Sequence, residues 1–245
     1  MRRVFYHLSR FFFVRKCVGC GEILDAEQHT DAFCPKCRVL WEGAKTANCP
    51  KCFGAVVECG CMPTTLKKSG ALCLRKLTFY RAELFHTPQN RLLYHLKHQP
   101  NRRIEGFVAK ELSKLVFKEC QTLELECPAQ EAVIVYLPRT GKAKRREGFD
   151  QSERLAKALS VESGIPFVSA ICRTGRSKEQ KSLQRNERFQ NVKGKFSLKN
   201  PEDVKGKCVF LLDDIVTTGA GMSECVKLLR HSGAKFVLCL CIAQD

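Results

Sequence analysis

The chain has 245 residues, enough for one large domain or for one domain with a small module beside it. Its 44% hydrophobic content is sufficient to bury a real core, which excludes a chain that is disordered throughout. The 42 Lys and Arg residues exceed the 25 Asp and Glu residues and leave a net charge of +17, which favours polyanionic partners, either nucleic acid or phosphorylated small molecules.

The first sixteen residues, MRRVFYHLSRFFFVRK, resemble a signal peptide only superficially. His7, Arg10, Arg15 and Lys16 interrupt the apolar part, and no small-residue cleavage site follows. We therefore predict that residues 1–16 form a basic arm of a cytoplasmic protein, with an amphipathic membrane anchor as the alternative. No apolar run of the chain approaches the ~20 residues that span a bilayer, so we expect no transmembrane segment.

Cysteine pairs dominate the next segment, residues 17–61. Cys17 and Cys20 are followed, after thirteen residues, by Cys34 and Cys37. A CxxC turn points two sulfur atoms at one centre, and two such turns complete a tetrahedron of thiolates. The spacing predicts a structural zinc site, with redox-active thiols as the alternative.

A second group of cysteines consists of Cys49, Cys52, Cys59 and Cys61. Its CxC half is less usual, because a single intervening residue strains the shared coordination. We predict a second zinc site here, with Cys73 as an alternative ligand.

Residues 17–61 are thus expected to form a zinc-binding module with one or two four-cysteine sites. Metal binding would supply much of its folding free energy. Trp41 is most simply the apolar plug of a module too small for a core of its own.

Residues 62–131 are predicted to be a linker and a helical lead-in to the core. The linker is MPTTLKKSG, and residues 74–86 look like extended chain. Amphipathic helices follow in residues 90–103 and 105–120. His95 and His98 lie three residues apart and can bind metal in principle, but an exposed basic helix is the simpler interpretation.

Residues 132–245 repeat a pattern of strand, loop and helix, which we assign to the core. The expected strands are residues 132–137, 167–171, 208–212 and 236–243. Helices are expected from about Gln151 and around Met222. Strands that are apolar on both faces and alternate with amphipathic helices predict a parallel α/β sheet.

The strongest site signal lies in CVFLLDDIVTTGAGMSECVKLLR, residues 208–230. Asp213 and Asp214 follow an apolar strand, and the loop at residues 217–221 carries little side-chain bulk. In open α/β sheets ligands bind beyond the carboxyl ends of the strands, and a loop of small residues that opens a helix presents N–H groups to an anion. Carboxylates accept hydrogen bonds from vicinal hydroxyls, so the segment fits a ribose 5-phosphate.

The same segment resembles the binding motif for phosphoribosyl diphosphate (PRPP) in type I phosphoribosyltransferases. Four apolar residues, two acids, two variable residues, Thr-Thr-Gly and a small tail all match. The resemblance implies that Asp213 and Asp214 contact the ribose hydroxyls and that Mg²⁺ bridges the diphosphate and ribose oxygens. The residues that would surround the 5-phosphate are Thr217, Thr218, Gly219, Ala220 and Gly221.

Two further segments acquire roles from this resemblance. The loop after the first core strand, with Pro138, Arg139 and Thr140, is expected to lie against the diphosphate, and residues 173–195 take the place of a flexible hood. Asp213, Asp214 and Arg139 are the predicted catalytic residues.

Over roughly residues 15–243 the chain resembles the ComF family. The matching features are the cysteine pairs, YHLKH, REGFDQSERLA, QKSLQRNERFQNVKGKF and the PRPP motif, in this order. The resemblance implies a zinc ribbon, a type I phosphoribosyltransferase-like sheet flanked by helices, and an association with the uptake of transforming DNA. Asp150 stands where Asn is commoner, and CGC replaces one CxxC half-site.

Two functional hypotheses follow. The first is a Mg²⁺-dependent phosphoribosyltransferase that displaces pyrophosphate from PRPP, with an unidentified acceptor. The second is a non-catalytic competence protein that binds single-stranded DNA, works with competence or recombination proteins and keeps a vestigial PRPP site. Residues 139–146 hold five positive charges and no acid, and residues 1–16 and 75–98 mix aromatic with basic side chains. Both patterns suit single-stranded DNA, and the predicted contacts are Lys97, Lys142, Lys144, Arg145 and Arg146. A basic α/β domain without a phosphate ligand is the remaining alternative.

Overall fold

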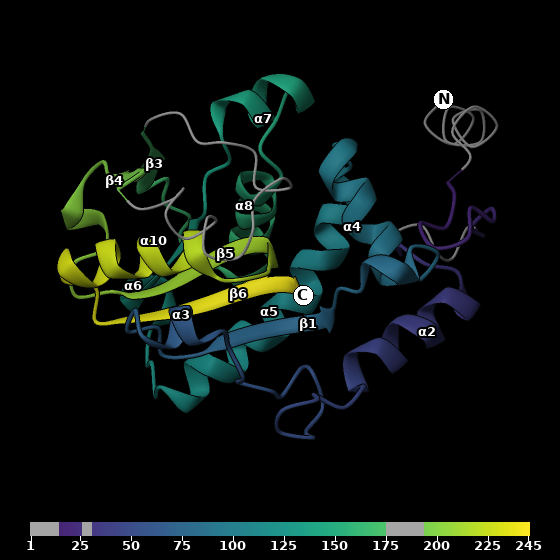
Figure 1. Cartoon of the computed structure of the whole chain (residues 1–245), viewed down its shortest axis with the longest axis horizontal. Coiled ribbons are helices and arrows are strands. Elements are labelled where there is room, and N and C mark those ends of the chain that lie inside the picture. Colours follow the sequence, from purple (N-terminus) through teal and green to yellow (C-terminus); the bar gives the residue numbers. More distant parts are fainter. Residues whose placement is uncertain (1–14, 26–30, 175–193) are drawn as a thin grey trace, which may run out of the picture.

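The computed structural model describes residues 15–25, 31–174 and 194–245 (Figure 1). Most of the predicted basic arm, residues 1–14, lies outside the described residues. So does the middle of the predicted hood, residues 175–193.

A parallel sheet of four strands forms the centre of the described chain, as predicted (Figure 1). Its order is β1-β6-β5-β2, and every neighbouring pair is parallel. The strands are β1 (Leu74–Phe79), β2 (Ala132–Tyr136), β5 (Cys208–Val216) and β6 (Phe236–Gln244). The predicted lead-in, residues 62–131, therefore contributes an edge strand to the sheet.

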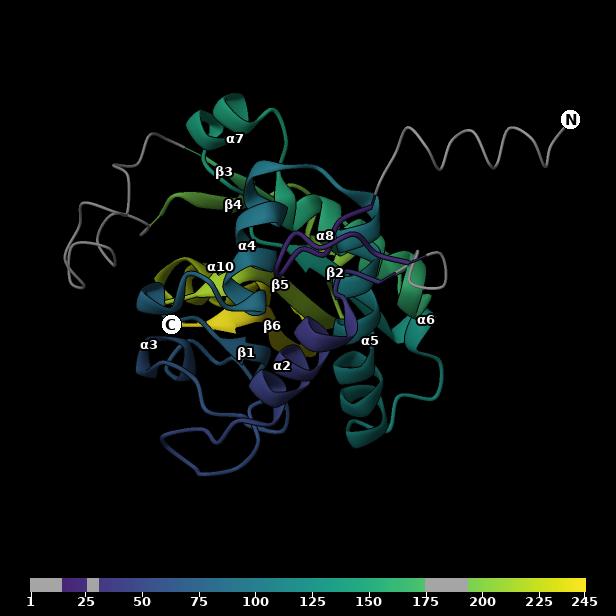
Figure 2. The same cartoon turned by 90° about the vertical axis from the view of Figure 1, so that its right-hand side faces the viewer.

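Helices cover both faces of this sheet (Figure 2). Helices α5 (Arg102–Thr122) and α8 (Gln151–Ser163) pack on one face, against residues such as Ile134, Phe210 and Leu240. Helices α10 (Ala220–His231) and α3 (Thr64–Lys67) lie on the other face, against Val135 and Leu211. Because successive strand residues point to opposite faces, each strand supplies apolar side chains to two separate cores.

The cysteine-rich segment packs directly on the core of the sheet. Helix α2 (Pro35–Thr46) carries Trp41, which is fully buried. The Trp41 ring lies 5.6 Å from that of Phe33 and 5.7 Å from that of Phe107 on α5. Trp41 thus packs inside the cysteine-rich segment, on Phe33, and also on α5 of the predicted lead-in, so this segment shares its core with the rest of the chain.

The segment predicted as one helix, residues 90–103, belongs to two helices. Helix α4 (Pro88–His98) ends before Pro100, and the Asn101 side chain begins α5 by accepting hydrogen bonds from the N–H groups of Arg103 and Ile104 at 3.0 and 3.3 Å. Such an N-cap supplies a hydrogen-bond acceptor to N–H groups of the first turn, which have no partner within the helix.

Three other elements differ from the predictions. Strand β5 extends through both aspartates to Val216, because β6 pairs with it as far as Gln244. The predicted loop before Asp150 contains helix α7 (Gly141–Glu147). In the expected strand 167–171, Phe167 makes a single bridge to Ile134, and β3 (Ile171–Arg173) pairs antiparallel with β4 (Phe196–Leu198).

Short helical turns complete the fold. They are η2 (Ala82–Leu84), α6 (Pro128–Glu131) and η4 (Pro201–Asp203). None of the described helices combines the length and the apolar character needed to cross a membrane.

Candidate functional site

A pocket of about 300 Å³ opens beyond the carboxyl ends of β2 and β5. Every residue predicted from the PRPP motif lines it: Pro138, Arg139, Thr140, Asp213, Asp214, Thr217, Thr218, Gly219, Ala220 and Gly221. Of the predicted DNA contacts, Lys97, Lys142 and Arg146 line the pocket. Lys144 and Arg145 lie outside this lining.

The loop of small residues begins helix α10. Gly219 is the N-cap residue with φ of +70°, a left-handed conformation that glycine adopts without strain. Gly219 has no side chain that could cap the helix, although the Thr218 hydroxyl accepts a long hydrogen bond, 3.4 Å, from the Ala220 N–H. Ala220, Gly221 and Met222 of the first turn line the pocket. The N–H groups of this turn and the positive end of the helix dipole make this wall of the pocket suited to an anion.

The two aspartates are held by the start of helix α8. Asp213 accepts hydrogen bonds from the Ser152 hydroxyl at 3.2 Å and from the Asp214 N–H at 2.9 Å. Asp214 accepts a bond from the Gln151 amide and another, at 2.8 Å, from the Ile215 N–H. Burial raises the pKa of Asp213 well above its usual value, and the negative charge of Asp214 adds to the effect.

Gln151 and Ser152 were missed as site residues at the sequence level. Their only signal was their position directly after Asp150 in the REGFDQSERLA segment. Nothing in the local sequence shows that this helix start faces the end of β5, since the two segments are more than 60 residues apart.

Asp150 joins the loop after β2 to the start of α8. Its buried carboxylate caps α8 and accepts a hydrogen bond from the Arg139 N–H at 3.0 Å. It also pairs with Lys144 at 3.0 Å. Burial lowers the pKa of Lys144, but its bond to Asp150 outweighs that effect and raises the pKa overall. Lys144 is thus paired with Asp150, and it lies outside the pocket lining.

Arg139 carries a further sign of an anion site. Its Nη1 atom is buried and has no hydrogen-bond partner among the described residues. Because a buried charged donor without a partner is costly, a guanidinium in this state is suited to bind an anionic ligand. Arg173 from β3 lines the same pocket, so positive side chains reach it from several elements.

A surface of aromatic and basic side chains lies beside the pocket on α4 and the turn before it. Phe85 and Tyr94 are 51% and 49% exposed, and their rings are 6.1 Å apart. The Tyr94 ring also lies 4.6 Å from that of His98. Lys97 of the same helix lines the pocket, so α4 carries both an exposed aromatic ring and a residue of the site.

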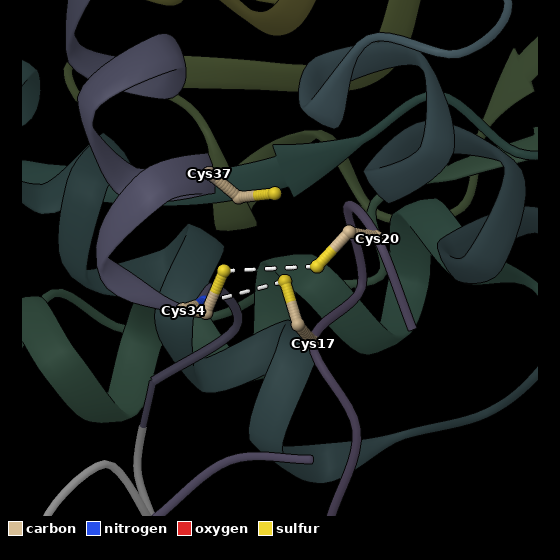
Figure 3. Close-up of side chains that lie close together, drawn as sticks. All are labelled: Cys17, Cys20, Cys34 and Cys37. Carbon is tan, nitrogen blue, oxygen red and sulfur yellow. Dashed lines mark hydrogen bonds between the residues drawn. The ribbon is translucent and has the colours of Figure 1, made fainter. Parts of the chain in front are cut away.

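The first cysteine group brings together Cys17, Cys20, Cys34 and Cys37, whose sulfur atoms all lie within 4.8 Å of one another (Figure 3). The Sγ atoms of Cys20 and Cys34 are 3.7 Å apart, close to the ~3.8 Å edge of a tetrahedron with Zn–S bonds of about 2.3 Å. Burial raises the pKa of Cys17, but N–H groups, that of Cys34 first, lower it to about 7. The group can therefore hold a thiolate-binding metal.

The second group consists of Cys49, Cys52, Cys59 and Cys61, again with all sulfur atoms within 4.8 Å of one another. Burial raises the pKa of Cys49, but the N–H groups of residues 51 and 52 lower it to about 6. The alternative ligand Cys73 lies outside the group and donates its thiol hydrogen bond to Glu119 at 3.6 Å. The CxC half-site thus completes a set of four sulfur atoms that can hold a metal.

Comparisons with known proteins agree with this fold. The family model described as phosphoribosyl transferase domain matches residues 145–245. A relative from Escherichia coli O157:H7, DNA utilization protein YhgH, is 31% identical over 84% of this chain and 89% of its own length. Competence protein ComFC of Streptococcus pneumoniae is 24% identical over 91% of this chain and 96% of its own length.

Among solved structures, the allosteric regulatory enzyme of purine biosynthesis is 20% identical, with a TM-score of 0.37 over 61% of this chain and 30% of its own. The matches to DNA utilization protein YhgH and to competence protein ComFC cover most of both chains, and so they extend beyond the phosphoribosyl transferase domain. The resemblance stated from the sequence is thereby confirmed, and the chain belongs to the ComF family.

Proposed function

We propose that this protein binds PRPP with Mg²⁺ in the pocket beyond β2 and β5 and transfers its phosphoribosyl group. The observation that carries the proposal is the meeting, in one pocket, of paired carboxylates, a helix start with glycine at its N-cap and an arginine whose buried Nη1 atom has no partner among the described residues. These three features suit the three parts of PRPP, which are a ribose, a 5-phosphate and a diphosphate.

Each part of PRPP has its own set of partners in this proposal. Asp213 and Asp214 accept hydrogen bonds from the ribose hydroxyls. The N–H groups of residues 218–221 bind the 5-phosphate, and Arg139 binds the diphosphate. Lys97, Lys142 and Arg146 add positive charge at the mouth of the pocket.

Catalysis would rest on charge stabilisation. As the bond from the ribose carbon to the diphosphate breaks, the sugar becomes positive and the leaving group keeps the electron pair. Asp213 and Asp214 face the developing positive charge, and Arg139 faces the departing diphosphate. Oxygen ligands of the kind that Mg²⁺ prefers are present in both aspartates, and the bound ion supplies further neutralisation of the leaving group. No histidine is among the described residues that line the pocket.

Calorimetric titration with PRPP and Mg²⁺ tests binding, and product analysis with a panel of nucleobases and amines tests turnover. We expect saturable binding that weakens in Arg139→Ala, with Arg145→Ala as a control that removes an arginine outside the pocket lining. Equal affinity of these two variants for PRPP would contradict the site. Release of pyrophosphate only in the presence of one acceptor would identify the reaction.

A second function, binding of single-stranded DNA, is favoured by the surface beside the pocket. Exposed Phe85 and Tyr94 can stack on bases while Lys97 and Arg146 meet phosphates. The names of the relatives, DNA utilization protein and competence protein, support this candidate. Both functions share basic residues of the pocket, so PRPP and DNA are expected to compete there in part. Competence or recombination proteins are the proposed protein partners.

We also propose zinc as the metal of both cysteine groups, because four thiolates at tetrahedral spacing and no open position are typical of structural zinc. None of the sixteen cysteines, all of which lie in the described residues, forms a disulfide, and eight of them are the proposed zinc ligands. Both points support a reducing compartment and thus the cytoplasm. The division into a module at residues 17–61, a lead-in at 62–131 and a core at 132–245 remains part of this proposal.

A further inference from the structure

The segment that follows the second cysteine group is packed against the loop of small residues in the pocket. Gly219 faces this segment so closely that an added Cβ atom would lie 3.4 Å from both Leu66 and Pro63. Leu66 is fully buried in the core beneath α10. The predicted linker is therefore part of the wall that supports the loop.

Two hydrogen bonds join the segment to the loop and to the helix behind it. The Thr65 hydroxyl donates to the carbonyl of Thr218. In return, the hydroxyl of Ser223, which is 1% exposed, donates to the carbonyl of Thr65 at 3.1 Å. Thr65 thus holds the loop at residue 218 and the first turn of α10 at residue 223.

The other end of the segment belongs to the second cysteine group. Cys61 is one of its four ligands and donates its N–H to Cys59 Sγ at 3.3 Å. The Cys61 carbonyl accepts a hydrogen bond at 2.9 Å from Lys76, a lysine of β1 that is fully buried. Lys76 also lies 3.5 Å from Cys59 Sγ, so its positive charge faces a cluster that becomes negative when it binds a metal.

Only residues 62–64 separate the ligand Cys61 from Thr65. We propose that the second cysteine group, once filled with metal, is the internal support of the phosphate-binding loop, with Thr65 as its positioning residue. The proposal rests on the proposed PRPP site, and it gives the second metal a role that the first does not have. The first group includes Cys37 of α2, and its Gly19 has no room for a side chain beside Cys37 and Pro88.

The inference is tested on the full chain with four variants. Thr65→Val removes the hydroxyl but keeps the shape, and Thr64→Val is its matched control because Thr64 is an exposed neighbour. Cys61→Ser removes a ligand of the second group, and Cys37→Ser removes one of the first group. The readouts are metal content, hydrogen exchange of a peptide covering residues 217–224, and calorimetry with ribose 5-phosphate and with pyrophosphate.

We expect Thr65→Val to retain its metal, to exchange faster at residues 217–224 and to bind ribose 5-phosphate about fivefold more weakly, as the loss of one hydrogen bond implies. Its affinity for pyrophosphate should not change, because Arg139 lies on another segment. Cys61→Ser should lose one metal and show the same local exchange. Thr64→Val and Cys37→Ser should leave exchange at residues 217–224 unchanged.

Unchanged exchange and ribose 5-phosphate affinity in Thr65→Val would overturn the proposal. Loss of one metal from Cys61→Ser without faster exchange at residues 217–224 would also overturn it. If the unsubstituted protein binds neither PRPP nor ribose 5-phosphate, the proposed function fails, and the exchange measurements still decide whether the segment supports the loop.

Discussion

Replacing Asp213 by Asn should separate the stability of the free protein from its affinity for ligand. The carbonyl oxygen of Asn can still accept the bonds from the Ser152 hydroxyl and the Asp214 N–H, which are 3.2 and 2.9 Å long. The variant also removes a buried negative charge that lies beside a second carboxylate. We therefore expect it to be at least as stable as the unsubstituted protein at neutral pH.

The sign of the pH dependence follows from the pKa of Asp213. Burial, and then the charge of Asp214, raise this pKa in the folded state, so the folded chain binds the proton more tightly than the unfolded chain does. The stability of the free protein should then fall as pH rises from about 4, the ordinary value for Asp, toward the raised pKa. In Asp213→Asn this part of the pH dependence should disappear.

Ligand affinity should change in the opposite direction. A hydrogen bond to a charged acceptor contributes roughly 1.5–3 kcal/mol, so PRPP should bind roughly 10- to 150-fold more weakly to Asp213→Asn. Asp214→Asn should show a loss of the same order. Thermal melting between pH 5 and 8 measures the first effect, and calorimetry with PRPP and Mg²⁺ measures the second.

Glu162→Gln is the matched control, because it removes one negative charge from an exposed position of α8. It should leave PRPP affinity unchanged. PRPP binding of normal strength in both aspartate variants would refute the assignment of the ribose to these carboxylates. A fall in stability of Asp213→Asn at neutral pH would refute the reasoning about its buried charge.

Three other predictions concern the metal, the basic surface and the ion pair that joins Lys45 of α2 to Glu111 of α5. Cys17→Ser should lower zinc content and melting temperature together, and normal values of both by elemental analysis and calorimetry would exclude a structural metal there. In anisotropy titrations, binding of single-stranded DNA should weaken steeply as the salt concentration rises and should be weaker in Arg146→Glu. Titrations that show no salt dependence would contradict a role for phosphate contacts. Burial raises the pKa of Glu111, but hydrogen bonds from Lys114 and Lys45 outweigh this effect and lower the pKa below 4.5. The stability that the Glu111 carboxylate contributes should therefore be present above pH 4.5 and be lost as the pH falls through the lowered pKa. Urea denaturation of Glu111→Gln should accordingly show a loss of stability at pH 7 that shrinks as the pH falls below 4.5.

The parallel sheet and the segments around the ligand pocket were predictable because their signals are local. Residues 208–221 contain a buried strand, its acidic end and its small-residue loop in one stretch, so their order along the chain is also their order in space. The cysteine groups were predictable for the same reason, since CxxC spacing alone brings two sulfur atoms to one centre.

The local signals were less reliable where an element depends on its neighbour. The strand expected to stop at Leu212 continues to Val216, because β6 offers hydrogen-bond partners along its whole length. The basic segment before Asp150 was predicted to be a loop. It forms helix α7, whose N-cap is the Thr140 side chain, accepting a hydrogen bond from the Ala143 N–H at 3.1 Å.

The sequence by itself determined the α/β class, the cysteine groups and the identity of the loop and acids at the end of β5. Only the tertiary structure decided which distant groups meet them: Ser152 at Asp213, Thr65 at Thr218 and Phe107 at Trp41. It also decided that Cys73 bonds to Glu119 and lies outside the second cysteine group. These contacts join segments that are far apart in the chain, and they are set by how helices pack on the sheet, which no spacing of residue types encodes locally.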